Sequence, residues 1–463
     1  MINVKSNPSF CEERQYIFDL VFSEIWNVDY KVVYEERCDI CIELGDKQLI
    51  IEDIFFQQKK KYFLKEESLP KQPLKHWEIG MDNLKKCVVN PVLPIIYGTT
   101  LNNNDYMREE DGVIHISIDI FGSAFFMLTR YEECVKSIRD AHDRFSAKNS
   151  LAYQESFLNR PIINEYLEIL WWSMRRLDPE LKRKQHRFQI IPTHDVDKPY
   201  FLALRSKFGM VKFLFGSFIH GKKIKTFIQN VKYLYNIKKK GLAGDIYNTF
   251  DLIMNISERN GVKSHFYFMT SLDRSIRDGN YDISRHEIIA IIKKILKRGH
   301  KIGVHPSYES YLDNKIISQD CNLLKAVLKS NDLEQYNIGG RQHYLRWKAP
   351  YTWRYYEEAG LLYDTSLSYA DHIGFRCGFC YEYSPYDLLE RRKLDLKEYP
   401  LIIMECSGLD HKYMNLSREE MLAKALKLKH YCKKYNGNFV ILWHNTFFVD
   451  AKDVDLYIKI IEN

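Results

Sequence analysis

Apolar and polar residues follow two different patterns along the chain. Before about residue 186, short β-branched runs such as 31–34 and 48–51 are broken by polar turns, whereas residues 105–180 are typical of helices rich in aromatic and charged side chains. This mixture predicts an α+β fold for the first part. The polar stretch 177–186 contains a proline and predicts a boundary, so we expect domains at 1–185 and 186–463.

The second part repeats a strand, a loop and a helix. Its apolar runs have the length and composition of buried parallel strands. These runs are residues 188–191, 265–268, 301–304, 401–404 and 438–442, with weaker candidates just before Arg341 and Asp364. Between them lie helices with apolar residues three and four positions apart, such as Ile288, Ile291 and Ile295. The alternation predicts a parallel sheet that is closed or nearly closed.

Composition and charge are those of a folded globular protein. Of the 463 residues, 45% are hydrophobic and 28% charged, and the net charge of +7 is spread along the chain rather than gathered into a stripe. We therefore expect no nucleic-acid partner. The first residues lack the pattern of a signal peptide, and no apolar run reaches the roughly 18 residues that span a bilayer. These features predict a cytoplasmic location with reduced thiols.

A basic insertion at about residues 200–245 separates the first two strands of the second part. Apolar residues, among them Phe201, Phe208, Met210 and Phe213, alternate there with lysine and arginine. A basic amphipathic helix of this kind can lie on an anionic membrane surface. The alternative, which we favour, is a helix that packs on the barrel and exposes its basic face to solvent.

Residues that can bind metal or move protons appear just past the ends of the apolar runs. They occur in Thr193-His194-Asp195-Val196-Asp197, His305-Pro306-Ser307-Tyr308, Arg341-Gln342-His343-Tyr344 and Trp443-His444-Asn445. Enzymes with β/α barrels build their active sites from such strand ends. Metal-assisted hydrolysis of an amide or ester uses a bound metal, a base and an acid, and the carboxylates and imidazoles of these segments can supply the metal ligands, the base and the acid. Ligands of this kind suit zinc and other first-row metals.

These segments resemble motifs of the polysaccharide deacetylase superfamily over about residues 186–460. That family opens with Thr-Phe-Asp-Asp-Gly, and residues 193–197 stand in its place. By this resemblance Asp195 is the catalytic base and Asp197 a metal ligand. The lead Gly299-His300-Lys301-Ile302-Gly303 is similar to the family's second motif, which makes His305 a ligand. The resemblance implies a distorted seven-stranded (β/α) barrel preceded by a smaller α+β domain.

The chain departs from the family four residues after His305, where Glu309 replaces a second ligand histidine. Either Glu309 binds the metal or His343 replaces the missing ligand, and we favour His343. Arg341 resembles the family arginine that pairs with the base. In Leu442-Trp443-His444, which resembles the last motif, His444 is the implied general acid.

The resemblance is closer to a branch of this superfamily found in bacterial surface-polysaccharide loci, which carries an extra N-terminal domain. The stretch 125–133 and the pattern Asp140-x-His142-x-Arg144-Phe145 are similar to that domain. Residues 366–372 and 374–378 also resemble this branch. We expect Asp364 or Asp371 to orient His444. Residues expected to contact the substrate are Arg376, Asp364, Trp443 and Tyr344.

The resemblance implies a metal-dependent hydrolase that removes an N-acetyl group from an amino sugar or polysaccharide precursor. One divalent ion is expected, with Zn²⁺ preferred and Co²⁺ or Ni²⁺ as alternatives. Another acyl group, such as N-formyl or a cyclic imide, would need the same residues. The alternative from a different class is a catalytically inactive barrel that binds a glycan or acts as a scaffold in polysaccharide biosynthesis, since the first and second motifs are altered.

Overall fold

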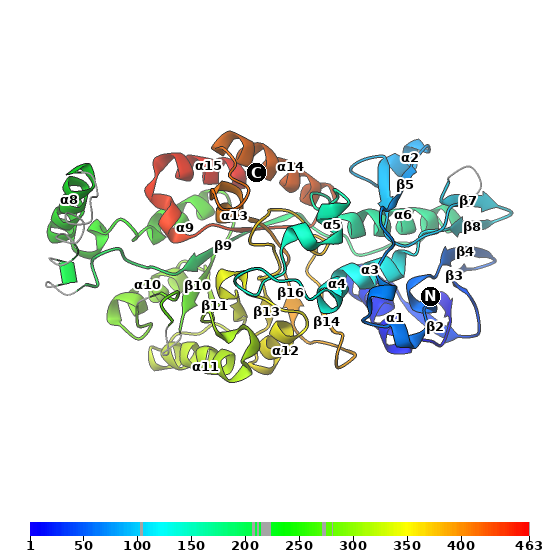
Figure 1. Ribbon diagram of the computed structural model, residues 1–463, viewed down its shortest axis with the longest axis horizontal. Coiled ribbons are helices and arrows are strands. Elements are labelled where there is room, and N and C mark those ends of the chain that lie inside the picture. Colours follow the sequence, from blue (N-terminus) through cyan, green and yellow to red (C-terminus); the bar gives the residue numbers. More distant parts are fainter. Residues whose placement is uncertain are drawn as a thin grey trace.

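The two patterns of the sequence correspond to two sheets that lie side by side along the long axis of the molecule (Figure 1). The computed structural model describes residues 1–101, 105–205, 209–210, 213, 224–270, 275–279 and 281–462. Residues 178–188, between the last N-terminal helix and the first strand of the second sheet, form neither helix nor strand. The division into two domains stays a prediction.

The N-terminal part is built on a mixed six-stranded sheet of order β2-β1-β3-β4-β8-β7. Its strands are β1 (Ile2–Ser6), β2 (Tyr30–Tyr34), β3 (Asp39–Leu44), β4 (Lys47–Glu52), β7 (Met107–Glu110) and β8 (Val113–Ile116). A separate hairpin pairs β5 (Lys75–Glu78) with β6 (Val92–Ile95). The helices are α1 (Cys11–Phe18), α2 (Asp82–Lys85), α3 (Ile120–Leu128), α4 (Tyr131–Val135), α5 (Leu151–Gln154) and α6 (Ile162–Leu177). The strands predicted at 31–34 and 48–51 are confirmed.

The helical interpretation of residues 105–180 is wrong at its start. Strands β7 and β8 form an antiparallel hairpin there, joined by Asp111 and Gly112. Both linking residues have positive φ angles, 49° and 79°. An Asp-Gly pair favours the two-residue turn that matches the twist of a β-hairpin, and this signal outweighs the polar composition of the flanking residues.

The second part is a curled sheet of eight parallel strands, in the order β16-β13-β12-β11-β10-β9-β18-β17. The strands are β9 (Gln189–Val196), β10 (His265–Met269), β11 (Lys301–His305), β12 (Gly339–Gly340), β13 (Tyr363–Asp364), β16 (Lys397–Glu398), β17 (Leu401–Met404) and β18 (Asn438–Leu442). All five predicted apolar runs and both weaker candidates lie in this sheet. Only β16 was not predicted, because it is two residues long and both are charged. Outside the sheet, β14 (Tyr386–Asp387) pairs with β15 (Arg392–Lys393).

The two edge strands of this sheet are neighbours in sequence. Strand β16 pairs with β13 and β17 pairs with β18, yet only Tyr399 and Pro400 separate them. Glu398 and Leu401 are three residues apart and their Cα atoms are separated by at most roughly 11 Å, so the two edges lie close together and the sheet curls almost into a closed barrel. Proline has no N–H to donate, which explains why strand pairing is interrupted at Pro400. The expected count of seven strands is not confirmed, since eight are present.

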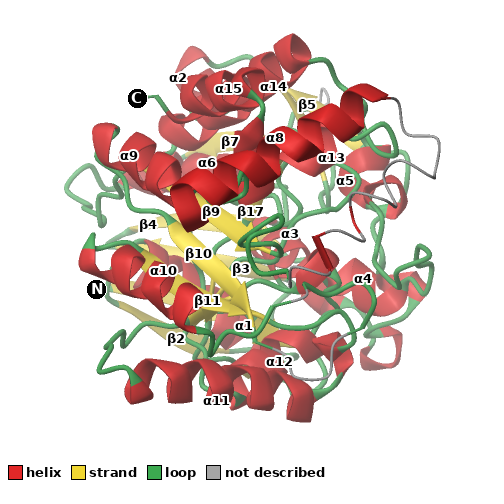
Figure 2. Ribbon diagram, turned by 90° about the vertical axis from the view of Figure 1, so that its left-hand side faces the viewer, coloured by secondary structure: helices red, strands yellow, loops and turns green. Residues whose placement is uncertain are grey.

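Helices cover the outside of the curled sheet (Figure 2). They are α9 (Phe250–Arg259), α10 (His286–Lys297), α11 (Asn314–Ser330), α12 (Tyr351–Glu358), α13 (Glu405–Leu409), α14 (Arg418–Lys434) and α15 (Ala451–Ile461). Helix α10 buries Ile288, Ile291, Ile292 and Ile295 as its apolar spacing predicts. The helices thereby leave the two ends of the barrel for loops.

The basic insertion forms helix α8 (Ile224–Lys240), which stands away from the barrel at one end of the molecule (Figure 1). Ile228, Val231 and Tyr235 are exposed on it, at 50%, 42% and 63%. Phe208 and most of residues 206–223 lie outside the described residues, so membrane contact through 200–245 stays a prediction. None of the helices in the described ranges combines the length and apolarity needed to cross a bilayer.

A buried ion pair joins the N-terminal part to the barrel. Arg376 binds the carboxylate of Glu133 at 2.5 Å, and both side chains are 2% exposed. Arg130 binds the same carboxylate at 2.8 Å. The guanidinium of Arg376 also lies over the rings of Trp347 and Tyr369, each at 4.9 Å. Arg376, which we expected to contact the substrate, therefore holds the two parts together instead.

This interface predicts a large stability loss in Arg376→Ala. The change breaks a buried ion pair and leaves Glu133 with Arg130 as its remaining cationic partner among the described residues, and it is expected to lower the free energy of unfolding by about 3 kcal/mol, the lower end of the range for a broken buried pair. Arg176→Ala is the matched control, because its partner Glu109 lies on the surface, where a pair contributes about 0–1 kcal/mol. Urea denaturation measures both, and equal losses would contradict the structural role of Arg376.

Candidate metal centre and catalytic site

Side chains alternate along a strand, so successive residues of the first motif, 193–197, point to opposite sides of the barrel wall. Asp195 and Asp197 are two positions apart and therefore share a face. His194 faces the other way, where it bonds the carbonyl of Trp443 at 2.7 Å and contacts the ring of Phe266. Burial lowers the pKa of His194 to about 3, so this imidazole is a neutral part of the core. The two aspartates of this strand end lie on the inner face.

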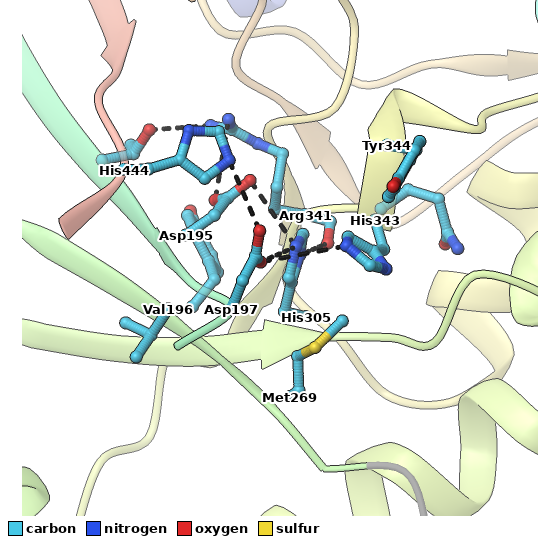
Figure 3. A network of polar contacts seen from close by, with 12 residues as sticks. Asp195, Val196, Asp197, Met269, His305, Arg341, His343, Tyr344 and His444 are labelled. Carbon is cyan, nitrogen blue, oxygen red and sulfur yellow. Dashed lines mark hydrogen bonds and ion pairs between the residues drawn. The ribbon is translucent and has the colours of Figure 1, made fainter. Parts of the chain in front are cut away.

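Three potential metal ligands meet at the carboxyl ends of the parallel strands (Figure 3). Asp197 follows β9, His305 ends β11, and His343 lies in the loop after β12. Their ligand atoms lie within 4.8 Å of one another. The Oδ1 atom of Asp197 is 3.3 Å from Nε2 of His305 and 3.9 Å from Nε2 of His343. One oxygen and two imidazole nitrogens thus converge on one point.

Hydrogen bonds behind the two histidines turn their Nε2 atoms toward that point. The Nδ1 atom of His305 donates to the carbonyl of Arg341 at 2.6 Å, and Nδ1 of His343 donates to Asp278 at 2.9 Å. A carbonyl and an ionised carboxylate only accept, so Nδ1 carries the proton in both rings. In the neutral form of each ring, Nε2 then carries the lone pair, which is the arrangement found in metal-binding histidines.

The donor set fits a first-row divalent ion. The Oδ1 atom of Asp197 and Nε2 of His305 are buried and have no hydrogen-bond partner among the described residues, which is costly unless another group satisfies them. Burial alone would raise the pKa of Asp197, but His305, His343 and His444 hold it well below the usual range. An ionised carboxylate and two imidazoles are the oxygen and nitrogen ligands that Zn²⁺ takes.

Asp195 lies beside the ligands with Arg341 next to it. Its Oδ2 is 3.7 Å from Nε2 of His305, and its Oδ1 is 3.9 Å from Nη1 of Arg341. Arg341 is fixed by hydrogen bonds to the hydroxyls of Thr193, at 2.8 Å, and Thr365, at 3.0 Å. The side chain of Asp195 is 4% exposed. A fixed guanidinium thus lies next to this buried carboxylate.

His444 faces Asp197 from the strand on the other side of β9. Its Nε2 is 3.8 Å from Oδ2 of Asp197, and its Nδ1 binds the carboxylate of Glu405. Burial opposes the charge of this imidazole, but Glu405 and Cys406 raise the pKa of His444 well above its ordinary value. His444 is thus held in its protonated form with one N–H directed into the site.

Glu405 is the residue that sequence reasoning missed here. Asp364 and Asp371 do not orient His444, because Asp364 accepts hydrogen bonds from Trp347 and Ser366, and Asp371 accepts them from Ser146 and Ala147. Glu405 immediately follows β17, so the strand-end rule that found the other residues also applies to it. The sequence analysis instead assigned the role of orienting His444 to Asp364 or Asp371.

The remaining expected residues fall into two groups. Asp364 and Trp443 are fully buried, so they are part of the barrel core rather than of an open surface. Tyr344 is 40% exposed and its ring lies 4.7 Å from that of His343, so it can reach a substrate. Glu309 is 58% exposed and pairs with Arg346 at 2.9 Å, which favours His343 over Glu309 as third ligand.

A cavity of about 640 Å³ opens at the opposite, amino end of the strands. Its lining includes the first residues of four strands, Gln189, His265, Lys301 and Lys397. None of the residues that converge on Asp197 lines this cavity. The candidate catalytic residues therefore lie at the carboxyl ends of the strands, where β/α barrels carry their active sites.

The convergence of Asp197, His305 and His343 predicts that the protein binds a metal ion and that binding requires both histidines. Purified protein supplied with Zn²⁺ is expected to retain about one ion per chain. His305→Ala and His343→Ala are each expected to lose it, with affinity reduced more than about 100-fold, because losing a ligand costs more than losing a residue behind one. Elemental analysis and chelator competition measure this.

Two variants serve as controls for the metal experiment. His286→Ala removes an imidazole that is 90% exposed and is expected to bind Zn²⁺ like the wild type. Glu309→Ala is expected to do the same. Loss of the ion in Glu309→Ala with retention in His343→Ala would reverse the ligand assignment.

A buried carboxyl group supports the loop after His305 and predicts a pH-dependent stability. Asp320 on α11 is 3% exposed and accepts a hydrogen bond from the N–H of Ser307 at 3.2 Å. Burial raises the pKa of Asp320 to about 7, whereas an unfolded chain has an aspartate pKa of about 3.9. The folded state therefore keeps a proton that the unfolded state releases, and this group's contribution to stability is lost as pH rises from about 4 to 7.

Asp320→Asn is expected to abolish the pH dependence of stability that arises from the Asp320 carboxyl group. The stability of the variant relative to wild type should increase between pH 5 and pH 8 in denaturation experiments. The matched control Asp82→Asn changes a carboxylate that is 90% exposed and should leave the profile unchanged. A difference between Asp320→Asn and wild type that is constant over this range would contradict the raised pKa.

Comparisons with known proteins give a family for the N-terminal part and a distant structural neighbour. Residues 2–179 match a family described as a family of unknown function (DUF7033). No curated protein matches the chain. One similar solved structure is the crystal structure of a "putative polysaccharide deacetylase from Mycobacterium smegmatis", 15% identical with a TM-score of 0.37. The alignment covers 61% of this chain and 85% of that one.

Proposed function

We propose that the protein is a metal-dependent hydrolase that removes an N-acetyl group from an amino sugar or a polysaccharide precursor. The observation that carries the proposal is the convergence of Asp195, Asp197, His305, His343 and His444 at one end of the barrel. A metal site, a shielded carboxylate and a protonated imidazole are groups that metal-assisted amide hydrolysis uses.

Asp197, His305 and His343 are the proposed ligands, with Zn²⁺ preferred over Co²⁺ or Ni²⁺. When bound, such an ion would polarise the acetyl carbonyl and make water more acidic. Three protein ligands are the number that catalytic zinc sites use, because a further position must remain for water and substrate. The resemblance of the strand-end motifs to deacetylases supports the choice of an acetyl amide.

Asp195 is the proposed general base. Its carboxylate lies beside the ligand His305 at 3.7 Å and has one oxygen without a hydrogen-bond partner, so it can accept the proton of an attacking water. Arg341 lies on the other side of this carboxylate, with Nη1 3.9 Å from Oδ1. The general base and the metal ligand are thus different aspartates of one strand end.

His444 is the proposed general acid. Glu405 binds its Nδ1, which directs Nε2 toward the site, and the raised pKa keeps the ring protonated. The N–H at Nε2 can then protonate the departing amine nitrogen and stabilise the oxyanion that precedes it. Acetate and a free amine are the expected products.

Acetate release from N-acetyl amino sugars tests this proposal. Asp195→Asn is expected to reduce turnover by roughly 10²–10⁴-fold, the contribution of a general base, while Zn²⁺ content and fold persist. Asp82→Asn is the exposed matched control. Unchanged turnover in Asp195→Asn would refute the base assignment.

The same assay separates the alternatives. Release of formate in place of acetate would indicate an N-formyl substrate that is hydrolysed by the same catalytic residues. A wild-type protein that binds Zn²⁺ and glycan but hydrolyses no acylated sugar would support the inactive glycan-binding barrel.

A further inference from the structure

A segment of the N-terminal part lies against the proposed metal centre. The chain between α4 and α5 reaches from the N-terminal sheet onto the barrel (Figure 1). Within it, the carbonyl of His142 accepts a hydrogen bond from Arg346 at 2.9 Å, and Asp143 accepts one from Tyr311 at 2.6 Å. The Nδ1 atom of His142 contacts the hydroxyl of Tyr308 at 2.8 Å. These barrel residues follow the ligands His305 and His343 in sequence.

Arg144 binds the turn that carries His343. Its Nη1 donates to the carbonyl of Tyr344 at 2.9 Å, and Asp140 holds the guanidinium from behind at 2.8 Å. Tyr344 and Leu345 both have positive φ angles, 62° and 50°. Residues with a side chain rarely adopt this conformation, which persists where surrounding contacts impose it. The hydrogen bond from Arg144 is such a contact, directly beside a proposed ligand.

Aromatic rings next to this turn form an open wall. Tyr344, 40% exposed, has the rings of His343, Tyr308 and His142 at 4.7, 5.2 and 5.3 Å. The contact with Tyr308 is edge-to-face, at 86°. Neighbouring rings hold the Tyr344 side chain in place while leaving part of it open. An exposed aromatic group beside polar catalytic groups is the usual composition of a small-molecule site.

We propose that residues 140–145 of the N-terminal part are a component of the active site. Arg144 is a positioning residue that holds the His343–Tyr344 turn. His142 and Tyr344 form the wall against which the sugar ring of the substrate packs. The carbohydrate nature of the ligand rests on the proposed function, whereas the positioning role of Arg144 rests on the contacts alone.

The test compares Arg144→Ala, Arg144→Lys and His142→Ala with the exposed control Arg176→Ala, all in the full chain. Hydrogen–deuterium exchange follows the amides of residues 342–347, and chelator competition gives the Zn²⁺ affinity. The values of kcat and KM are measured on an N-acetyl amino sugar. Melting temperatures report on global stability.

Arg144→Ala is expected to speed exchange at residues 342–347, to weaken Zn²⁺ binding and to raise KM by about tenfold, the effect of removing one hydrogen bond from a charged donor. Arg144→Lys should restore part of each change, because the ammonium keeps the charge but lacks the planar fork. His142→Ala should raise KM with kcat and exchange unchanged, since it removes binding without disturbing the turn. Arg176→Ala should match the wild type throughout.

Wild-type exchange, Zn²⁺ affinity and KM in Arg144→Ala would overturn the inference. A lower melting temperature and a lower kcat at unchanged KM and Zn²⁺ affinity would also overturn it, because that pattern indicates general destabilisation. If the wild type hydrolyses no acylated sugar, the proposed function fails. Exchange and Zn²⁺ affinity in Arg144→Ala then still decide the positioning role.

Discussion

The parallel register of the central strands is the constraint on which the site depends. Strand β10 aligns Phe268 with Val196 of β9 and Met269 with His305 of β11. This pairing brings the ends of β9 and β11 to the same level of the barrel. A shift of one residue would turn Asp195 and Asp197 outward and His194 inward, since strand side chains alternate. Hydrogen bonds to the far side of each ligand imidazole then orient the rings toward the site.

The strands and most of the site could be predicted because their signals are local. Buried parallel strands read as continuous apolar runs, and residues 438–442 coincide with β18. Polar residues at the ends of such runs identified Asp195, Asp197, His305 and His444. Hydrophobic burial imposes both features, and neither needs knowledge of distant contacts.

The residues that were missed act through long-range contacts. Asp278 binds His343 across 65 positions, and Glu405 binds His444 across 39. Arg376 looked like a substrate residue, but it pairs with Glu133, which is 243 positions away. An ionisable residue has the same appearance in a sequence whether it faces substrate or a buried partner. Only the three-dimensional arrangement separates these roles.

The N-terminal part and the barrel depend on each other physically. The Glu133–Arg376 pair and the contacts of residues 140–145 cross between them, so the wall of the site is built from both. The central feature of the proposed site is one cation held by Asp197, His305 and His343. X-ray diffraction at the zinc absorption edge, on crystals grown with Zn²⁺, tests this most directly. One anomalous peak within bonding distance of all three side chains is predicted, whereas a peak elsewhere or none would contradict it.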